Sequence, residues 1–531
     1  MAIATPSEQG RTSPPETTRA QWWALAALTA SVLVVGLDSY ILYTALPTLS
    51  SSLGASTTQL QWIQTAYTLT WAGLLLPIGK LGDRIGLRLM LLAGLVVFGV
   101  SSVLASQADS AGALIALRAT MGAGAAVIMP MVLALLPALF PDAAARRKAV
   151  AVTTIGAMLG LPLGPLLAGW LLTHFSWGSV FLINGPVVLA SLIGVFFLVP
   201  ESKDPAKPRI DWLGAVLSAA GVMGVVYGII EQPTYGWDTQ VLAPLIGGVV
   251  LIAVFLMWQR RVSEPLVDLK LLRNRTFTWG TVAFAVISFS MSGIMFIVSP
   301  FLQVVLDNDP QGTGLRLLPM IGAVLAGAGV SDTYASKFGT KAVLPFGMVV
   351  SAVGLVLLTL VHADSGYGPV ALALVVFGLG LGVSMPLAAD SVLDALAPEQ
   401  TGMGNALSRT MQSFGSALGA ASLGSLLNGA FRGRLDGTLD TLGLTGAAHD
   451  GARSGIAGAH TVAAHLPGQA ARTLAEAANR AYAHGMLEAA VTSATMSVLG
   501  GLLVFWLLPK VAATPSAKTT EMAMAAASPD R

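Results

Sequence analysis

Long apolar runs, separated by short polar segments, recur along almost the whole of this 531-residue chain. Each run holds about 20 residues or more, the length that a helix needs to cross the hydrocarbon core of a bilayer. Only 11% of the residues are charged, whereas soluble proteins carry about 25%. The sequence therefore predicts an all-α integral membrane protein. Its fourteen expected transmembrane helices are 22–45, 59–79, 88–107, 111–138, 148–172, 178–199, 211–231, 240–259, 277–303, 313–331, 342–361, 369–393, 401–428 and 486–508.

The positions of Lys and Arg predict the orientation. If the N-terminus lies in the cytoplasm, the short loops on the cytoplasmic side carry most of the basic residues and the short loops on the other side carry none. Cytoplasmic loops of membrane proteins carry an excess of Lys and Arg, so we expect both termini in the cytoplasm. The net charge of +2 gives no reason to expect a nucleic-acid partner, and the absence of cysteine excludes disulfides and thiol chemistry.

A charged stretch with three glycines joins the second and third runs, from Gly79 to Arg88. It is too short for a domain, so two membrane helices are expected to meet there at a tight basic loop. An ordinary cytoplasmic turn would account for the basic residues, but not for the spacing of the glycines and the aspartate. The spacing resembles the signature loop between helices 2 and 3 of the major facilitator superfamily. The resemblance implies a conformational latch formed by Gly79, Asp83, Arg84, Gly86 and Arg88.

Asp38 is an acidic residue deep in the first apolar run. It lies about 16 residues past the start of the helix, which places it about 24 Å into a core about 30 Å thick. A carboxylate at this depth is costly and suggests a functional site; the alternative is an acid that reaches the outer interface or caps a kink. The segment from Leu37 to Pro47 resembles the L-D-x-T-I-V-N-V-A-L-P motif of drug:proton antiporters, with Tyr40 and Tyr43 in place of Thr and Asn. The resemblance implies that Asp38 couples protons.

Arg118, in the fourth run, is expected about 10 Å below the outer surface, at a depth similar to that of Asp38. Opposite charges that pair lower each other's cost of burial. A proton on Asp38 would break the pair, and Arg118 would help to expel it again. The segment resembles the helix-4 motif R-x-x-x-G-x-G-A-A, whose arginine is tied to proton transfer. The alternative is an arginine that only holds helices together.

The fifth run carries glycines at a four-residue spacing, which allows close helix packing, and prolines, which kink helices. It resembles the motif G-x-x-x-G-P-x-x-G-G that marks antiporters, and this implies export. The matching residues are Gly160, Gly164, Pro165 and Gly169, with Ala168 in place of one glycine. The segment from Trp177 to Pro186 resembles the W-G-S-V-F-L-I-N-x-P segment of the branch that exports quaternary ammonium compounds and other lipophilic cations.

Aromatic residues of helices 1 and 2 are the candidate substrate pocket: Tyr40, Tyr43, Trp62, Tyr67 and Trp71. The quaternary-ammonium branch often has an acid in helix 2 and a Glu pair in helix 13, where this chain has Thr65, Ser408 and Arg409. Cation pockets use buried carboxylates and aromatic faces. We therefore expect monocationic, neutral or anionic amphiphiles rather than dications alone. Asp390 and Arg409 are a possible ion pair at the inner gate; the alternative is interfacial anchoring.

Two features recur eight helices apart. Residues 332–341 repeat the basic–Gly–basic spacing of 79–88, and Gly415 and Gly419 repeat the Gly-x-x-x-Gly pair of helix 5. This shift predicts two pseudo-symmetric six-helix bundles with two helices inserted between them. The expected divisions are an N-tail 1–21, a first bundle 22–199, the inserted helices 200–276, a second bundle 277–508 that includes an extracytoplasmic loop 429–485, and a C-tail 509–531. The loop is either a tolerated surface insertion or an access element.

No G-x-x-x-x-G-K-[ST] motif predicts ATP binding, and no Cys/His cluster predicts a metal site. The resemblance implies a secondary active transporter rather than an enzyme. It would be a proton-coupled antiporter for multidrug efflux, in the bilayer of a bacterial cell membrane, monomeric and without a cofactor, exporting amphipathic small molecules in exchange for protons. One alternative is a dedicated exporter of an endogenous specialised metabolite. A remote alternative is a membrane sensor, which would require a large folded cytoplasmic domain that the sequence does not contain.

Overall fold

The computed structural model describes residues 18–202, 211–263, 265–396 and 401–509, and all regular structure within these ranges is helical. The expected tails lie almost wholly outside these ranges. A short 3-10 turn, η1 (Leu271–Arg273), precedes α11, and a π-helical turn, η2 (Phe301–Val305), follows it. In chain order the helices are α1 (Arg19–Leu53), α2 (Thr57–Ile85), α3 (Leu87–Ala105), α4 (Ala111–Leu139), α5 (Ala143–Met158), α6 (Gly160–His174), α7 (Ser179–Leu182), α8 (Asn184–Leu198), α9 (Trp212–Tyr235), α10 (Thr239–Gln259), α11 (Arg275–Pro300), α12 (Pro310–Phe338), α13 (Thr340–Leu358), α14 (Tyr367–Asp394), α15 (Thr401–Thr441), α16 (Gly446–Arg453), α17 (Ile456–Ala464) and α18 (Gly468–Leu507).

Twelve helical segments of the described chain are long and apolar enough to cross a membrane. The fourteen expected spans are therefore not confirmed. The two that fall short are helices, α2 and α15, whose sequences are rich in Thr and Gln or in Gly and Ser. These two helices pack against each other, and the Gln61 side-chain amide donates to the carbonyl of Ala421 over 2.9 Å. A helix that is covered by other helices does not need an apolar surface, which explains their weaker hydropathy.

The expected loop from Gly79 to Arg88 is mostly helical, and this prediction of a ten-residue loop was wrong. Helix α2 continues to Ile85, and only Gly86 separates it from α3. Gly86 has φ = 129°, a backbone conformation that side chains with a Cβ rarely adopt. The break between α12 and α13 is also a single glycine, Gly339, with φ = 82°. The repeated basic–Gly–basic spacing therefore places one glycine hinge in each half of the chain.

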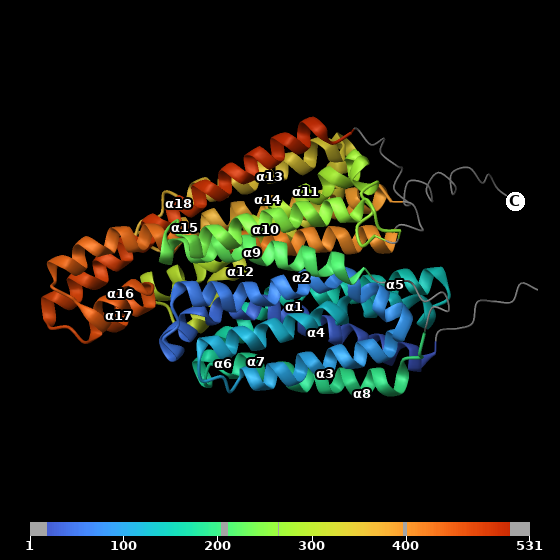
Figure 1. The fold of residues 1–531 in the computed structure, drawn as a ribbon, viewed down its shortest axis with the longest axis horizontal. Coiled ribbons are helices and arrows are strands. Elements are labelled where there is room, and N and C mark those ends of the chain that lie inside the picture. The colour runs from blue at the N-terminus through green and yellow to red at the C-terminus, as the bar shows by residue number, and fades with distance from the viewer. Residues whose placement is uncertain (1–17, 203–210, 264, 397–400, 510–531) are drawn as a thin grey trace, which may run out of the picture.

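The expected loop 429–485 is also helical, and we call it the knob. Helices α15 and α18 have 41 and 40 residues. At 1.5 Å per residue each is about 60 Å long, about twice the hydrocarbon core. Their ends project beyond the bundle and, together with α16 and α17, build the knob at one end of the molecule (Figure 1). The opposite end, where α1 begins and α18 ends, is called the tail end.

Glycines allow two pairs of helices to cross at very short distance. A Cβ at Gly160 of α6 would collide with the backbone of Gly36 in α1. A Cβ at Gly415 of α15 would collide with the backbone of Ala285 in α11. Each Gly-x-x-x-Gly motif thus allows its helix to pack closely against the first helix of its half, α6 against α1 and α15 against α11. The glycine motif of α6 also contacts the second half of the chain, since Gly169 lies against Pro310 at the start of α12.

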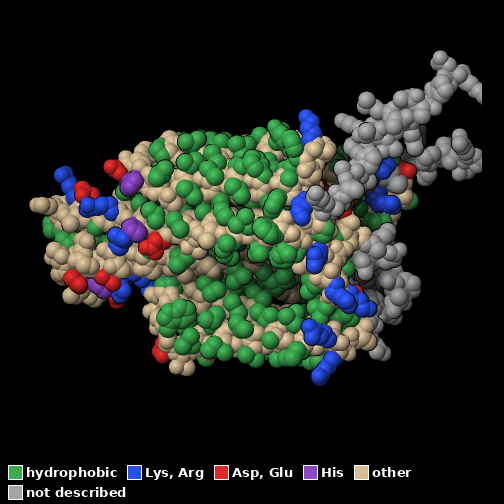
Figure 2. Space-filling model, turned by 90° about the horizontal axis from the view of Figure 1, so that it is seen from above, with side chains coloured by type: hydrophobic (Ala, Val, Ile, Leu, Met, Phe, Trp, Pro, Cys, Tyr) green, Lys and Arg blue, Asp and Glu red, His purple; other side chains and the backbone are tan. Residues whose placement is uncertain are grey.

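The contacts between the two sets of helices, α1–α8 and α11–α18, gather toward the knob end. There a Cβ at Gly314 of α12 would collide with the carbonyl of Pro165 in α6, and Thr57 at the start of α2 donates its backbone N–H to Ser454 of the knob over 2.7 Å. Figure 2 shows a hollow between hydrophobic side chains in the middle of the molecule, with Lys and Arg side chains toward the tail end. The helices are therefore closed together at the knob end.

Candidate functional site

Asp38 and Arg118 form an ion pair in the interior of the first set of helices. The Nη1 of Arg118 in α4 lies 2.6 Å from the Oδ2 of Asp38 in α1, and both side chains are fully buried. Both residues were expected at similar depth, and the structure brings them together. In a low-dielectric interior each charge lowers the cost of burying the other. The pair therefore depends on Asp38 being ionised.

The other carboxylate oxygen of Asp38 also has a partner, Asn184 in α8. The Asn184 side-chain amide lies 3.3 Å from Oδ1 of Asp38 and 3.0 Å from the hydroxyl of Ser102 in α3, and both residues are buried. The Ser102 hydroxyl in turn donates to the carbonyl of Phe181 over 2.8 Å. Four helices thus meet at one polar cluster. Sequence reasoning did not assign a role to Asn184 or Ser102, although a lone amide within an apolar run was the available signal.

The Arg118 side chain is oriented from the side of α2. Its Nε donates to the carbonyl of Ile63 over 3.2 Å, and its guanidinium carbon lies 4.2 Å from the ring centroid of Tyr67. Such cation–π contacts are favourable when they are shielded from water. A Cβ at Gly122 would collide with the Tyr67 carbonyl, so this glycine lets α4 approach α2. Trp71 continues the aromatic surface, with its ring 6.1 Å from that of Tyr67.

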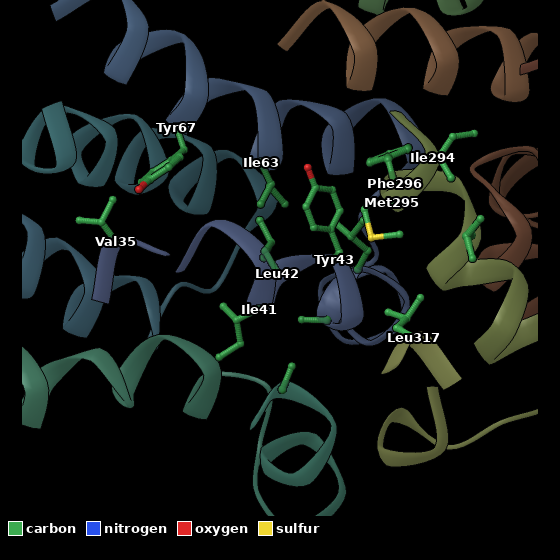
Figure 3. Packing of buried hydrophobic residues seen from close by; sticks show 14 of the residues in the cluster. Val35, Ile41, Leu42, Tyr43, Ile63, Tyr67, Ile294, Met295, Phe296 and Leu317 are labelled. Atoms are coloured by element: carbon green, nitrogen blue, oxygen red, sulfur yellow. The ribbon is translucent and has the colours of Figure 1, made fainter. Parts of the chain in front are cut away.

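Helix α1 also links the two sets of helices just after Asp38. The Tyr43 hydroxyl lies 2.9 Å from the hydroxyl of Ser292 in α11, and Gln303 of η2 donates to the carbonyl of Thr44 over 2.6 Å. Figure 3 shows Tyr43 of α1 beside Met295, in a cluster that also contains residues of α2 and α12. The segment of α1 that carries Asp38 is therefore connected directly to the second set of helices.

Trp62, one of the expected substrate-pocket residues, contacts the inserted helix α9. Its ring lies 5.9 Å from that of Tyr227, and its indole N–H donates to Glu231 over 2.8 Å, both on α9. Trp62 therefore anchors α9 to α2. Glu231 thus has a specific hydrogen-bond partner in this contact.

The structure does not pair Asp390 with Arg409. Among the described residues no ion pair joins them, and the charges that act on Asp390 are those of Asp332 and Asp394. The guanidinium of Arg409 instead lies 5.9 Å from the ring centroid of Phe284 in α11. The two residues were expected at compatible depths, but their side chains point to different neighbours.

The latch residues lie where α2 meets α3 at the tail end. Arg88 donates to the carbonyl of Phe196 near the end of α8, and its backbone N–H binds Glu201 over 3.1 Å. A cation at a helix C-terminus is favourable. Arg84 is exposed and has no partner among the described side chains. Gly79 faces open space, and the side chain of Asp83 lies outside the part that the structure describes.

A family model described as Major Facilitator Superfamily matches residues 28–420. The chain belongs to this superfamily. It is 33% identical over 497 residues to the multidrug efflux pump LfrA of Mycolicibacterium smegmatis, covering 93% of this chain and 98% of that protein. It is 32% identical to the tetracenomycin C resistance and export protein of Streptomyces glaucescens, covering 91% of each. It is 30% identical to the methyl viologen resistance protein SmvA of Salmonella typhimurium, covering 77% and 83%.

Solved structures support the same fold. A bacterial homologue of the human lysosomal transporter Spinster superposes with a TM-score of 0.65 at 15% identity, covering 94% of this chain and 100% of that one. A D-xylose–proton symporter gives a TM-score of 0.61 at 13% identity, covering 92% and 98%. The chain is therefore a multi-pass membrane transporter of the superfamily and not an enzyme, it is related to multidrug and antibiotic export pumps at about 30% identity, and it needs no cofactor.

Proposed function

We propose that this protein is a proton-coupled antiporter that exports amphipathic small molecules by alternating access. The observation that carries the proposal is the fully buried Asp38–Arg118 pair, linked through α1 to the second set of helices. An ionisable pair at membrane depth is costly and marks a functional site by default. The printed names of the relatives, a multidrug efflux pump and an antibiotic export protein, support export as the direction.

Proton binding to Asp38 supplies the coupling step. A proton removes the negative charge of Asp38, so its attraction to Arg118 is lost, as is the charge-assisted hydrogen bond from Asn184. The buried Arg118 cation then favours release of the proton once the site faces the other side. Because Tyr43 and Thr44 of the same helix contact α11 and η2, a small movement of α1 reaches the opposite half. Proton and substrate would thus bind in alternation.

The same proposal includes the topology. We place fourteen helices across the bacterial cell membrane, with α2 and α15 as the two that are largely enclosed by other helices. The termini are cytoplasmic and the knob extracytoplasmic, with bundles at 22–199 and 277–508 and inserted helices within 200–276. Asp83 and Arg84, with Gly79, Gly86 and Arg88, would latch the tail end when it closes. The exposed Arg84 fits a state in which this end is open.

A dedicated exporter of one endogenous specialised metabolite is the second candidate. It is favoured by the 32% identity to a protein named for the resistance to, and export of, a single compound, tetracenomycin C. Both candidates use the same coupling chemistry, and they differ only in the breadth of substrates. Competition by a panel of unrelated amphiphiles in a transport assay separates them. Inhibition by many compounds supports multidrug efflux, whereas inhibition by one structural class supports a dedicated exporter.

The proposal is tested by dye uptake into everted membrane vesicles with an acidified interior. Fluorescein and rhodamine 123 share a xanthene ring system, so either dye serves as an amphipathic probe. Wild type is expected to accumulate a dye, and a protonophore should abolish this. Asp38→Asn should lose uphill accumulation but retain downhill exchange of dye, because substrate binding does not need the proton. Loss of uphill accumulation with retained downhill exchange indicates uncoupling, whereas loss of both indicates misfolding.

Ser31→Ala is the matched control. Ser31 is buried in the same helix, and among the described residues its hydroxyl bonds only to the carbonyl of Ala27, so accumulation should remain at the wild-type level. Accumulation that persists in Asp38→Asn would show that Asp38 is not the coupling acid. Accumulation that persists with the protonophore would contradict proton coupling itself.

A further inference from the structure

Arg409 is a second arginine at membrane depth, and it has a different environment from Arg118. It lies on α15, eight residues or about 12 Å past the start of the helix at Thr401. Helix α15 packs against α2, α9, α11, α14 and α18, so it is enclosed on most sides. The Arg409 side chain is nevertheless exposed. Tyr40, on α1 of the opposite set of helices, lies near enough to interact with it electrostatically. The guanidinium therefore faces the space between the two halves.

Among the described residues, no carboxylate compensates the charge of Arg409. The side-chain hydrogen bond that it donates within this part of the chain is to the amide oxygen of Gln412, over 3.4 Å. Arg118, by contrast, is neutralised by Asp38. An unpaired arginine at membrane depth is costly unless it meets water or a ligand of opposite charge.

The surroundings of Arg409 are aromatic and apolar. The ring of Phe284 lies 5.9 Å from its guanidinium carbon, and Tyr40 faces it from α1. The hollow between the halves in Figure 2 is lined by hydrophobic side chains. A ligand that fits these features has an apolar ring system to pack against the walls and an acidic group to bind the planar guanidinium, which binds carboxylates in bidentate fashion.

We propose that Arg409 is the recognition site for an anionic group on the exported substrate, so that the preferred substrates are aromatic anions, such as compounds with a carboxylate or an ionised phenol. The inference rests on the proposed function, because it names the substrate class of that same transport site. It predicts charge selectivity opposite to that of a transporter for lipophilic cations. Arg409 would set the selectivity, while Asp38 would set the coupling.

Equilibrium dye binding to the purified full-length protein tests this selectivity without requiring transport. Fluorescein is an aromatic anion and rhodamine 123 an aromatic cation on the same ring system, and fluorescence anisotropy measures both. Wild type should bind fluorescein about tenfold more tightly than rhodamine 123, since a hydrogen bond to a charged group is typically worth this much. Arg409→Gln should weaken fluorescein binding by about tenfold and leave rhodamine 123 unchanged.

Two further substitutions make the test specific to charge. Arg409→Lys should keep most of the preference for fluorescein, and Arg409→Glu should reverse it in favour of rhodamine 123. The control is Arg316→Gln, because Arg316 also lies over an aromatic ring, Tyr367 at 5.4 Å, but near the start of α12 at the knob end. It should bind both dyes like wild type.

Equal binding of the two dyes by wild type, tighter binding of rhodamine 123, or no binding of fluorescein by protein that is monodisperse on gel filtration would each overturn the inference. Fluorescein affinity that is the same in Arg409→Gln as in wild type would overturn it as well. These outcomes are separate from failure of the proposed function, which is measured by proton-driven accumulation in vesicles. Vesicles that accumulate rhodamine 123 in preference to fluorescein under the same proton gradient would support antiport and reject the anion site.

Discussion

The side-chain amide of Asn184 lies 3.3 Å from Oδ1 of Asp38, the carboxylate oxygen that Arg118 does not bind. Asp38 thus has one charged and one neutral donor, on different helices. Both donors stabilise the ionised carboxylate relative to the protonated acid. The carboxylate of the proposed coupling site is therefore held by α4 and α8 as well as by α1.

Replacement of Asn184 by leucine removes one donor and keeps a similar volume. The ionised carboxylate of Asp38 then lacks its second hydrogen-bond donor, so the rate of dye accumulation should fall by about tenfold. The measurement is the initial rate of dye accumulation in vesicles at a fixed proton gradient. Ser191→Ala is the control, because Ser191 is buried on the same helix and its hydroxyl has no partner among the described residues. An unchanged rate in Asn184→Leu would show that transport does not depend on this contact.

The loss of folding stability on removing Asp38 should depend on whether the charge of Arg118 is left behind. Asp38→Leu leaves a buried arginine without its counter-ion and should destabilise the protein by about 3–5 kcal/mol. The double variant Asp38→Asn with Arg118→Gln buries no charge and should recover most of that loss, while uphill transport stays absent. Thermal unfolding of the purified wild type, Asp38→Leu and the double variant measures these differences in folding stability. A double variant as unstable as Asp38→Leu would mean that the pair contributes through shape rather than charge.

The two glycine motifs should respond differently to an added methyl group. Gly160→Ala would push a Cβ into the backbone of Gly36 and should cost about 1–3 kcal/mol of folding stability. Gly79→Ala meets open space and should leave the stability unchanged, so Gly79 serves as the control. Unfolding midpoints of the two variants give the comparison. Equal midpoints would contradict the close crossing of α1 and α6.

The sequence predicted how deep a charged residue lies in the membrane better than it predicted which side of its helix the residue occupies. Hydropathy places Asp38 and Arg118 at the same depth, and they do meet. It also places Asp390 and Arg409 at compatible depths, yet they face different neighbours. A linear pattern of apolar residues fixes how far a residue lies along a helix. The side on which it points depends on the packing of α14 and α15, which no local pattern encodes.

The extent of the helices was also only partly predictable. The break between α2 and α3 falls at Gly86, because glycine adopts a positive φ without strain. The charged residues before it suggested a loop, but Lys and Arg are also good helix formers, and α2 continues to Ile85. The knob was likewise expected as a loop because its sequence is polar, but its Ala-rich segments favour helix and extend α15 and α18. Asn184 was missed because an amide within an apolar run does not reveal which residue it will bind.

The contact between Thr57 and Ser454 offers a direct test of whether the knob takes part in the transport cycle. Thr57 begins α2, and both its backbone N–H and its hydroxyl donate to the Ser454 carbonyl, over 2.7 and 3.0 Å. If the knob end opens during transport, these residues must separate. The chain has no cysteine, so Thr57→Cys combined with Ser454→Cys introduces a unique pair. Oxidation should then stop dye accumulation, and a reductant should restore it.

The single variants Thr57→Cys and Ser454→Cys are the controls, and neither should respond to oxidant. Mobility on non-reducing gels reports whether the disulfide has formed. A cross-linked protein that still accumulates dye at the wild-type rate would show that the knob stays attached to α2 throughout the cycle. Opening at this end would then have to occur between α6 and α12 instead, with the knob still joined to α2.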